Sequence, residues 1–346
     1  MIGFNLTEEQ KEMQAFFRKF SQERVKAAAE KMDEEEKMDM DLIHEMQSLG
    51  MFGIPFSEEV GGAGLDVFNY VLLMEELSKV DASTSITVSV HTSLCASSIE
   101  EFATPEQKEK WLRPLADGSK IFTTNSGFAD TFLVFALTDK AAGPHKGMSA
   151  FLIDRNTPGI TVQPDIKRMG IRGASNSEVV YTDVRVPASD LLGGEGKGFK
   201  IAMKALDGGR IGIAAQSVGL AQGALDEAIA YCKERKQFGK PITAFQNTQF
   251  RIAELQARID AARLLTWRAA VAKDNGEPYN VYAAEAKLVA SDVANDVCRA
   301  AVQFMGGYGY CREYGVERKL RDVKITEIYE GTSEVMKMVI SGSLLR

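Results

Sequence analysis

The chain has 346 residues, 45% of them hydrophobic and 26% charged, a composition typical of soluble globular proteins. This length is sufficient for two or three compact regions, each with its own core. The formal net charge of −7 at pH 7 argues against nucleic acid or an anionic membrane surface as the main partner. We see no targeting peptide and no apolar run long enough to cross a membrane, so we expect a cytoplasmic protein without membrane insertion.

Cysteines and histidines are too scattered to indicate a metal site. The four cysteines include no CxxC pair, and the three histidines have no metal-ligand spacing. These features are typical of a reduced protein and predict no bound metal. The sequence also lacks a P-loop, a Ser-His-Asp signature and a nicotinamide-binding fingerprint, which argues against a hydrolase or a metal enzyme.

Residues 1–117 are predicted to form an N-terminal helical domain. Thr7 and Gln10 have the spacing of a capping box, and apolar residues then recur at helical intervals. Near the end of this region, Thr104 and Pro105 supply an N-cap and a first-turn proline for a short helix.

Residues 118–196 are predicted to form a small antiparallel β middle domain. Their apolar runs are short, favour strands and are separated by glycine and proline. The predicted strands cover residues 132–137, 149–153, 160–162 and 179–186.

Residues 197–346 return to long helices. Ile252, Leu255, Ile259 and Ala262 follow a three-four rhythm that favours an antiparallel four-helix bundle. The predicted fold class is therefore mostly α, with a β domain in the middle.

Asp207-Gly208-Gly209-Arg210 lies inside a strongly helical stretch. Two glycines in a helix cost about 1 kcal/mol each relative to alanine, so they need a reason. One interpretation is close helix packing. The other is a ligand that lies against the glycines while Asp207 and Arg210 bond its polar parts.

A second cluster, Arg235 to Pro241 followed by Phe245 and Gln246, comes at the predicted end of the same helix. Basic residues in the last turn, followed by glycine and proline, are typical of a helix C-terminus. That interpretation does not explain Phe238 beside Arg235, a combination that suits a phosphate with an attached ring system.

A third cluster is glycine-rich and runs from Gln303 to Gly309. It can be a plain loop between helices, or a loop that lets a flat or phosphorylated ligand touch backbone amides. It follows a helix and not a strand, so it is not a dinucleotide-binding fingerprint.

The fourth cluster is Tyr329-Glu330-Gly331-Thr332, which places a carboxylate on a turn beside a glycine. A desolvated carboxylate there would have a raised pKa and could act as a base on carbon. The competing interpretation is that Gly331 and Thr332 serve only to end one helix and cap the next.

Together, in this order, the four clusters resemble the acyl-CoA dehydrogenase family, most closely its short-chain (butyryl-CoA dehydrogenase) members. The resemblance covers essentially the whole chain and includes three further stretches, Gly61 to Gly64, Lys167 to Arg172 and Gly194 to Phe199. It implies FAD-dependent α,β-dehydrogenation of a short-chain acyl-CoA to the trans-2-enoyl-CoA. It also implies a homotetramer (a dimer of dimers) and an electron-transferring flavoprotein as partner.

In this resemblance Glu330 is the base that removes the α-proton, and hydride passes to flavin N5. Family members with the base on the helix carry a glutamate where this chain has Gly209, which leaves Glu330 as the candidate. The substrate-binding residues implied are Asp207, Gly208, Gly209, Arg210 and Gly331.

The implied FAD contacts fall into two groups. Those to the FAD of a neighbouring subunit are Arg235, Phe238, Gln246, Gln303, Phe304, Met305, Gly306 and Gly307. Those within the subunit are Thr332, Ser333 and Glu334, and Phe122, Thr123 and Thr124 match the family's short flavin-contacting strand in the β domain.

The chain departs from the family pattern near residues 116–119. Ala116-Asp117-Gly118 runs directly into Ser119, where family members have the first strands of the β domain and a flavin-binding L-x-E-P…G-S-D loop. About three strands, roughly 35 residues, are missing. Because this loss leaves strand edges unpaired, we expect weak FAD binding. The alternatives are a catalytically impaired, flavin-poor chain that acts as a CoA-binding or scaffold subunit, and a deletion or gene-model artefact.

Overall fold

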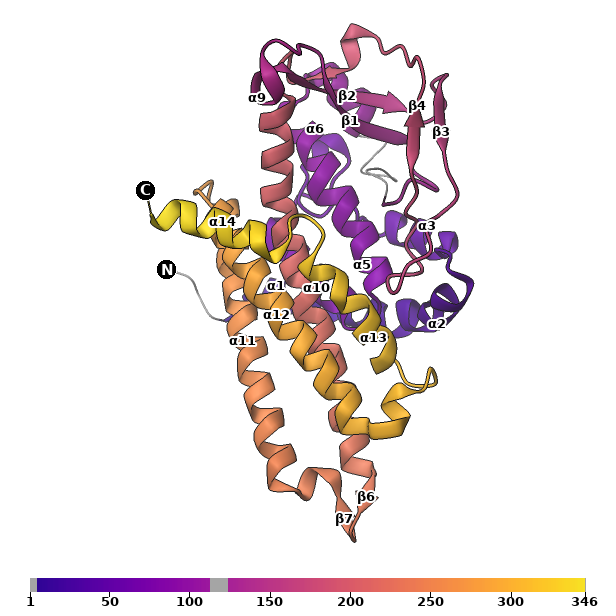
Figure 1. Cartoon of the computed structure of the whole chain (residues 1–346), viewed down its shortest axis with the longest axis vertical. Helices are drawn as coiled ribbons and strands as arrows, with labels where there is room; N and C mark the ends of the chain where they lie inside the picture. The colour runs from indigo at the N-terminus through magenta and orange to yellow at the C-terminus, as the bar shows by residue number, and fades with distance from the viewer. Residues whose placement is uncertain (1–4, 113–123, 346) are drawn as a thin grey trace.

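The computed structural model describes residues 5–112 and 124–345. Helices come first, a small β region follows, and long helices complete the chain (Figure 1). This architecture confirms the predicted fold class. The domain borders at residues 117 and 196 stay predictions.

The N-terminal region is a stack of short helices. The predicted capping box is present, since the Thr7 side chain accepts a hydrogen bond from the Gln10 backbone at 3.2 Å. Helix α4 is buried almost all round because it packs against α1, α10 and α11. The elements are α1 (Glu8–Phe20), η1 (Ser21–Val25), α2 (Lys26–Glu35), α3 (Met40–Ser48), η2 (Glu58–Val60), α4 (Val67–Ser78), α5 (Ala82–Ser89), η3 (Val90–Ala96), α6 (Ser97–Phe102), α7 (Pro105–Gln107) and η4 (Lys108–Leu112).

The middle region contains two small antiparallel sheets, of order β1-β2-β5 and β3-β4. Strands β1 and β2 pair along their whole length, with Phe132 opposite Ile153. Among the described strands, β1 has a neighbour on one side only. The elements are β1 (Thr131–Leu137), α9 (Gly143–Gly147), β2 (Met148–Asp154), β3 (Ile160–Val162), β4 (Val179–Tyr181), η5 (Ala188–Asp190) and β5 (Leu191–Leu192).

The last predicted strand, 179–186, is wrong in its second half. Strand β4 ends at Tyr181, and the chain turns at Asp183, whose φ of +51° lies in the left-handed region. A residue in that conformation cannot continue a strand. The backbone N–H of Thr182 instead donates to the carbonyl of Gly159 at 2.9 Å.

The C-terminal region is built on three long helices that run side by side (Figure 1). Helix α10 has 37 residues, about 55 Å at 1.5 Å per residue, and it contacts α4, α11, α12 and β2. The elements are α10 (Gly198–Glu234), β6 (Lys236–Gln237), β7 (Lys240–Pro241), η6 (Ile242–Ala244), α11 (Gln246–Asp274), α12 (Asn280–Met305), η7 (Gly306–Tyr310), α13 (Val316–Val323), η8 (Lys324–Glu327) and α14 (Ser333–Leu344).

Helix α10 ends at Glu234, earlier than the glycine and proline suggested. Arg235 is already extended, and residues 236–241 form the β6–β7 hairpin at one end of the molecule (Figure 1). Phe238 and Gly239 both have positive φ, +52° and +78°, as a two-residue hairpin turn requires. The glycine therefore serves the hairpin and not a helix cap.

We predict that Gly219→Ala destabilises the protein and Gly342→Ala does not. A methyl group at Gly219 would overlap the Glu75 carbonyl where α10 meets α4, whereas one at Gly342 on α14 would meet no described atom within 4 Å outside its own helix backbone. Overpacking should lower the free energy of unfolding by about 1–3 kcal/mol. The exposed alanine should raise it by roughly 0.5–1 kcal/mol. Urea unfolding measures both, and equal midpoints for the two variants would contradict this helix contact.

Candidate functional site

A cavity of about 490 Å³ lies where the three regions of the chain meet. Its volume is within the range of small-molecule sites. One wall comes from α5 and η3, a second from the loop of residues 168–176, and a third from residues 321–330. Its apolar lining residues include Ile86, Val90, Leu94, Leu206, Ile325 and Ile328, and its polar ones include Thr124, Arg168, Asn176, Arg321, Lys324 and Glu330.

The Glu330 carboxylate is the most unusual group in this cavity. Both of its oxygens are buried, and neither has a hydrogen-bond partner among the described residues. Its backbone has φ +53°, a left-handed conformation that costs about 1–2 kcal/mol outside glycine. Such strained residues cluster at functional sites, where the surrounding structure holds them in place.

Two buried cations hold the Glu330–Gly331 turn through its carbonyl oxygens. Arg210 Nε donates to the Glu330 carbonyl at 3.4 Å, and Lys287 Nζ donates to the Gly331 carbonyl at 2.6 Å. Asp207 Oδ1 accepts from Arg210 Nη1 at 2.7 Å and so orients the guanidinium. Both cations therefore stabilise the turn without forming a hydrogen bond to the carboxylate itself.

Burial controls the protonation of this site. It raises the pKa of Glu330 to about 8, while the positive charges of Lys287 and Arg210 oppose the rise. Burial also lowers the pKa of Lys287 to about 8, and the nearby Glu330 carboxylate opposes that change. A carboxylate with a pKa near neutrality can both accept and release a proton at physiological pH.

Gly209 provides the space that the Glu330 carboxylate occupies. A methyl group at this position on α10 would overlap Glu330 Oε2 and come within 2.9 Å of Leu94. Gly208 faces elsewhere, with Lys273 Nζ 3.1 Å from the place of its missing Cβ. For Gly209, close packing is the observed reason, and the packed group is the candidate base.

A buried polar network lies behind the candidate base. The Tyr329 hydroxyl donates to Gln216 Oε1, and Gln216 Nε2 donates to the Ala82 carbonyl at 3.0 Å. The Tyr70 hydroxyl donates to Ser89 Oγ at 3.1 Å. Burial raises the pKa of both tyrosines, and the negative charge of Glu330 adds to the rise, so they stay protonated.

Two residues of the site were missed by the sequence reasoning. Lys287 lies between Ala283 and Ala290 on the buried face of α12. A lysine at helical spacing from these apolar positions is the sequence feature that could have indicated a buried charge. Arg168 donates from Nη2 to the Ile171 carbonyl at 3.4 Å. Its Nε and Nη1 are buried without partners in the described part of the chain.

Most of the residues assigned to a neighbouring subunit's FAD meet in a second cavity of about 490 Å³. Arg235, at the C-terminal end of α10, comes 25 residues after Arg210. At a helical rise of 1.5 Å per residue this separates Arg235 from Arg210, beside Glu330, by about 37 Å. Phe238 and Gln246 do not line this second cavity, and Phe238 is 92% exposed. The predicted residues that line it are Arg235, Gln303, Phe304, Met305, Gly306 and Gly307.

The residues assigned to FAD within the subunit are divided. Thr332, Ser333 and Glu334 line a groove of about 540 Å³ at the start of α14, where Thr332 is the N-cap. Thr124 lines the Glu330 cavity. Phe122 and Thr123 lie outside the described residues.

Family models match the chain in three parts. The acyl-CoA dehydrogenase N-terminal domain matches residues 7–119, the middle domain matches residues 95–184, and the C-terminal domain matches residues 196–345. The chain belongs to the acyl-CoA dehydrogenase family. It is thereby an enzyme of an FAD-dependent family.

Close relatives match over their full length. The short-chain specific acyl-CoA dehydrogenase of Clostridium acetobutylicum is 48% identical over 380 positions that cover 100% of both chains. The structure of butyryl-CoA dehydrogenase from Megasphaera elsdenii has a TM-score of 0.96 and 44% identity, with 100% of both chains covered.

Two further structures bear on partner and cofactor. One described as electron transferring flavoprotein of Acidaminococcus fermentans has a TM-score of 0.97 and 44% identity, covering 100% of both chains. A glutaryl-CoA dehydrogenase from Mycobacterium smegmatis in complex with FADH2 has a TM-score of 0.90 and 27% identity, covering 98% of this chain and 95% of that one.

The Clostridium alignment also supports the predicted loss of residues. It spans 380 positions, whereas this chain has 346 residues, so at least 34 positions have no counterpart here. Because both chains are covered completely, the missing positions are internal. Their number agrees with the roughly 35 residues expected to be absent from the β domain. Within residues 5–112 and 124–345, no helix has the length and apolarity of a membrane span.

We predict that Glu330→Gln becomes progressively more stable than the parent protein as the pH rises from about 5 to about 8. Burial raises the pKa of Glu330 from 4.5 to about 8, so in this window the folded chain holds a proton that the unfolded chain releases. The free energy of unfolding of the parent therefore falls with pH through this group, and that of the variant does not. Thermal unfolding across this range measures the difference.

The control for this experiment is Glu9→Gln, on the exposed face of α1. A difference from the parent for Glu330→Gln that varies with pH no more than that of Glu9→Gln would contradict the raised pKa of the buried carboxyl.

Proposed function

We propose that this chain catalyses the FAD-dependent α,β-dehydrogenation of a short-chain acyl-CoA to the trans-2-enoyl-CoA, with Glu330 as the α-proton base. The observation that carries the proposal is the unpaired Glu330 carboxylate, buried in a cavity between all three regions and shifted to a pKa of about 8. The names of the relatives support the short-chain substrate.

The α-hydrogen of a thioester is a weak acid, so its removal requires a well-placed base and a stabilised carbonyl oxygen. The Cα–H bond breaks, and the proton is taken up by the Glu330 carboxylate. Among the described residues, no hydrogen bond involves the backbone N–H of Glu330, which leaves it available as a donor to the thioester oxygen. Glu330 can thus serve both as the base, through its carboxylate, and as a hydrogen-bond donor, through its backbone N–H.

The remaining residues predicted to bind substrate are arranged so that they position Glu330. Asp207 orients Arg210, and Arg210 holds the Glu330 carbonyl, so both act on the position of the base. Gly209 leaves room for the carboxylate. Gly331, at φ +103°, is proposed to lie beside the thioester, while its carbonyl is held by Lys287.

The residues around the Glu330 cavity fit a flavin. The cavity has apolar walls, and Arg168 brings to it two buried nitrogens, Nε and Nη1, that have no partner among the described residues. Thr124 and Asn176 are further polar neighbours. When bound, FAD supplies the acceptor for the hydride that leaves the β-carbon. The groove at Thr332, Ser333 and Glu334 begins a helix, whose N-terminus suits negatively charged phosphate groups.

The second cavity supports a homotetramer in which neighbouring subunits complete each other's FAD sites. Arg235, which lines this cavity together with Gly306 and Gly307, lies 25 residues after Arg210, about 37 Å at the helical rise of α10. Phe238 and Gln246, which stand outside this cavity, are proposed to reach the same FAD. We further propose a cytoplasmic location and an electron-transferring flavoprotein as the electron acceptor, as the description of one matching structure suggests.

We predict that Glu330→Gln lowers butyryl-CoA turnover by about 10²–10⁴-fold, because an amide cannot accept the proton. Turnover is measured with an artificial electron acceptor, so that the partner flavoprotein is not needed. Glu9→Gln is the control and should retain parental turnover. Retention of activity by Glu330→Gln would show that another group is the base.

We predict that the purified protein contains less than one FAD per chain, because the missing strands leave one side of the flavin uncovered. Absorbance spectra before and after adding FAD, each with and without butyryl-CoA, measure both the content and the bleaching on reduction. A stoichiometric yellow protein with normal turnover would contradict weak binding.

The alternative, a flavin-poor chain that acts as a CoA-binding or scaffold subunit, is not supported by the full-length relatives, which are named as dehydrogenases. Binding of butyryl-CoA without flavin reduction would support it. Sequencing across the codons for residues 115–120 distinguishes a natural deletion from an artefact.

A further inference from the structure

We propose that Lys287 is a positioning residue for the reaction, which holds the Glu330–Gly331 turn and keeps the Glu330 carboxylate available as a base. The inference rests on the proposed role of Glu330. Lys287 is fully buried at 0% exposure, and its ammonium donates to the Gly331 carbonyl at 2.6 Å. It therefore contacts the residue next to the base and not the carboxylate.

A lysine at this position needs an explanation. The neighbouring buried positions on the same face of α12 are Ala283, Ala290 and Ala294, where small residues allow close packing with α10. Burying an ammonium group is costly unless it is hydrogen-bonded or paired. Here a carbonyl oxygen and a nearby carboxylate together compensate for the lost water.

Charged and titratable groups face Lys287 from each element around it. Glu330 contributes the largest charge effect and raises the pKa of Lys287, and Arg210 on α10 lowers it. Glu327 on η8 and Glu334 on α14 also raise it. Lys287 in turn is the leading cationic influence on Glu330, ahead of Arg210.

In this geometry Lys287 anchors the turn without forming an ion pair that would fix the charge of the Glu330 carboxylate. A direct salt bridge to Glu330 would hold the carboxylate but also lower its proton affinity strongly. Because Lys287 bonds the Gly331 carbonyl, the turn keeps its anchor in both protonation states of Glu330. The ammonium charge favours the carboxylate before proton transfer, and the carbonyl bond persists after the proton has arrived.

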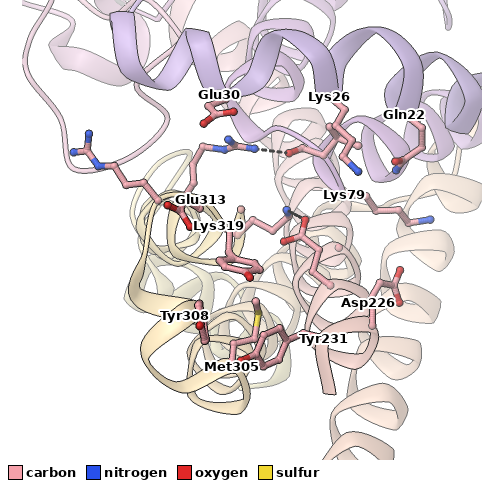
Figure 2. A pocket seen from close by; sticks show the side chains of 18 of the residues that line it. Gln22, Lys26, Glu30, Lys79, Asp226, Tyr231, Met305, Tyr308, Glu313 and Lys319 are labelled. Carbon is pink, nitrogen blue, oxygen red and sulfur yellow. Dashed lines mark hydrogen bonds and ion pairs between the residues drawn. The ribbon is translucent and has the colours of Figure 1, made fainter. Parts of the chain in front are cut away.

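The test compares Lys287→Met, Lys287→Gln and Lys287→Arg in the full chain with FAD added. The matched control is Lys319→Met. Lys319 on α13 is also buried, and it pairs with Glu227 beside another cavity that is lined by Tyr231 and Tyr308 (Figure 2). Replacing Lys319 should lower the free energy of unfolding without changing the titration midpoint of Glu330.

Two measurements report on the base. The infrared band of the Glu330 carboxylic acid, assigned by its absence in Glu330→Gln, gives the titration midpoint. Mass spectrometry of butyryl-CoA incubated in deuterated water gives the rate of α-hydrogen exchange. For Lys287→Met and Lys287→Gln we expect a midpoint about one unit higher and exchange at neutral pH about tenfold slower. Lys287→Arg should restore both values, because it keeps the charge and the donor.

The outcomes separate this inference from the proposed function. Parental midpoints in Lys287→Met and Lys287→Gln, or an equal shift in Lys319→Met, would overturn the role of Lys287. If Glu330→Gln still exchanges the α-hydrogen at the parental rate, the proposed base is wrong, whatever Lys287 does. If Lys287→Met fails to fold, Lys287→Gln decides, since its amide can still donate to the Gly331 carbonyl.

Discussion

The Glu330 carboxylate is buried without a hydrogen-bond partner among residues 5–112 and 124–345, and the site depends on this constraint. Desolvation raises its pKa to about 8, and the structure compensates around the carboxylate instead of at it. Arg210 and Lys287 hold adjacent carbonyl oxygens, and Gly209 leaves the space. The carboxylate stays reactive because no donor in the described part of the chain forms a hydrogen bond to it.

Helix α10 joins this site to the rest of the molecule. Its first third carries Asp207, Gly209 and Arg210, and Arg235 directly follows its last residue. Between these two sites the helix packs closely on α4 and α12. A single rigid helix thereby sets the separation between the candidate base and the cavity proposed to receive a neighbouring subunit's FAD.

The β region shows where local patterns were sufficient and where they were not. The starts of four strands were predicted to within one residue, because short apolar runs separated by turn residues are local signals. The strand predicted to reach Val186 stops at Tyr181, since the left-handed turn at Asp183 left no recognised sequence signal. Likewise, Gly239 belongs to a hairpin, although glycine after basic residues is equally typical of a helix end.

The sequence by itself determined the order of helices and strands, the glutamate on a turn, the glycines inside a helix and the internal loss of residues. These features depend on neighbours in the chain or on motifs in a fixed order. Only the tertiary structure decided that Gly209 and Glu330 occupy adjoining space and that Lys287 is buried beneath the same turn. The hydrogen bonds that hold this turn join residues far apart in the sequence: Arg210 and Glu330 are 120 positions apart, and Lys287 and Gly331 are 44 apart. They arise because α10 packs against α12.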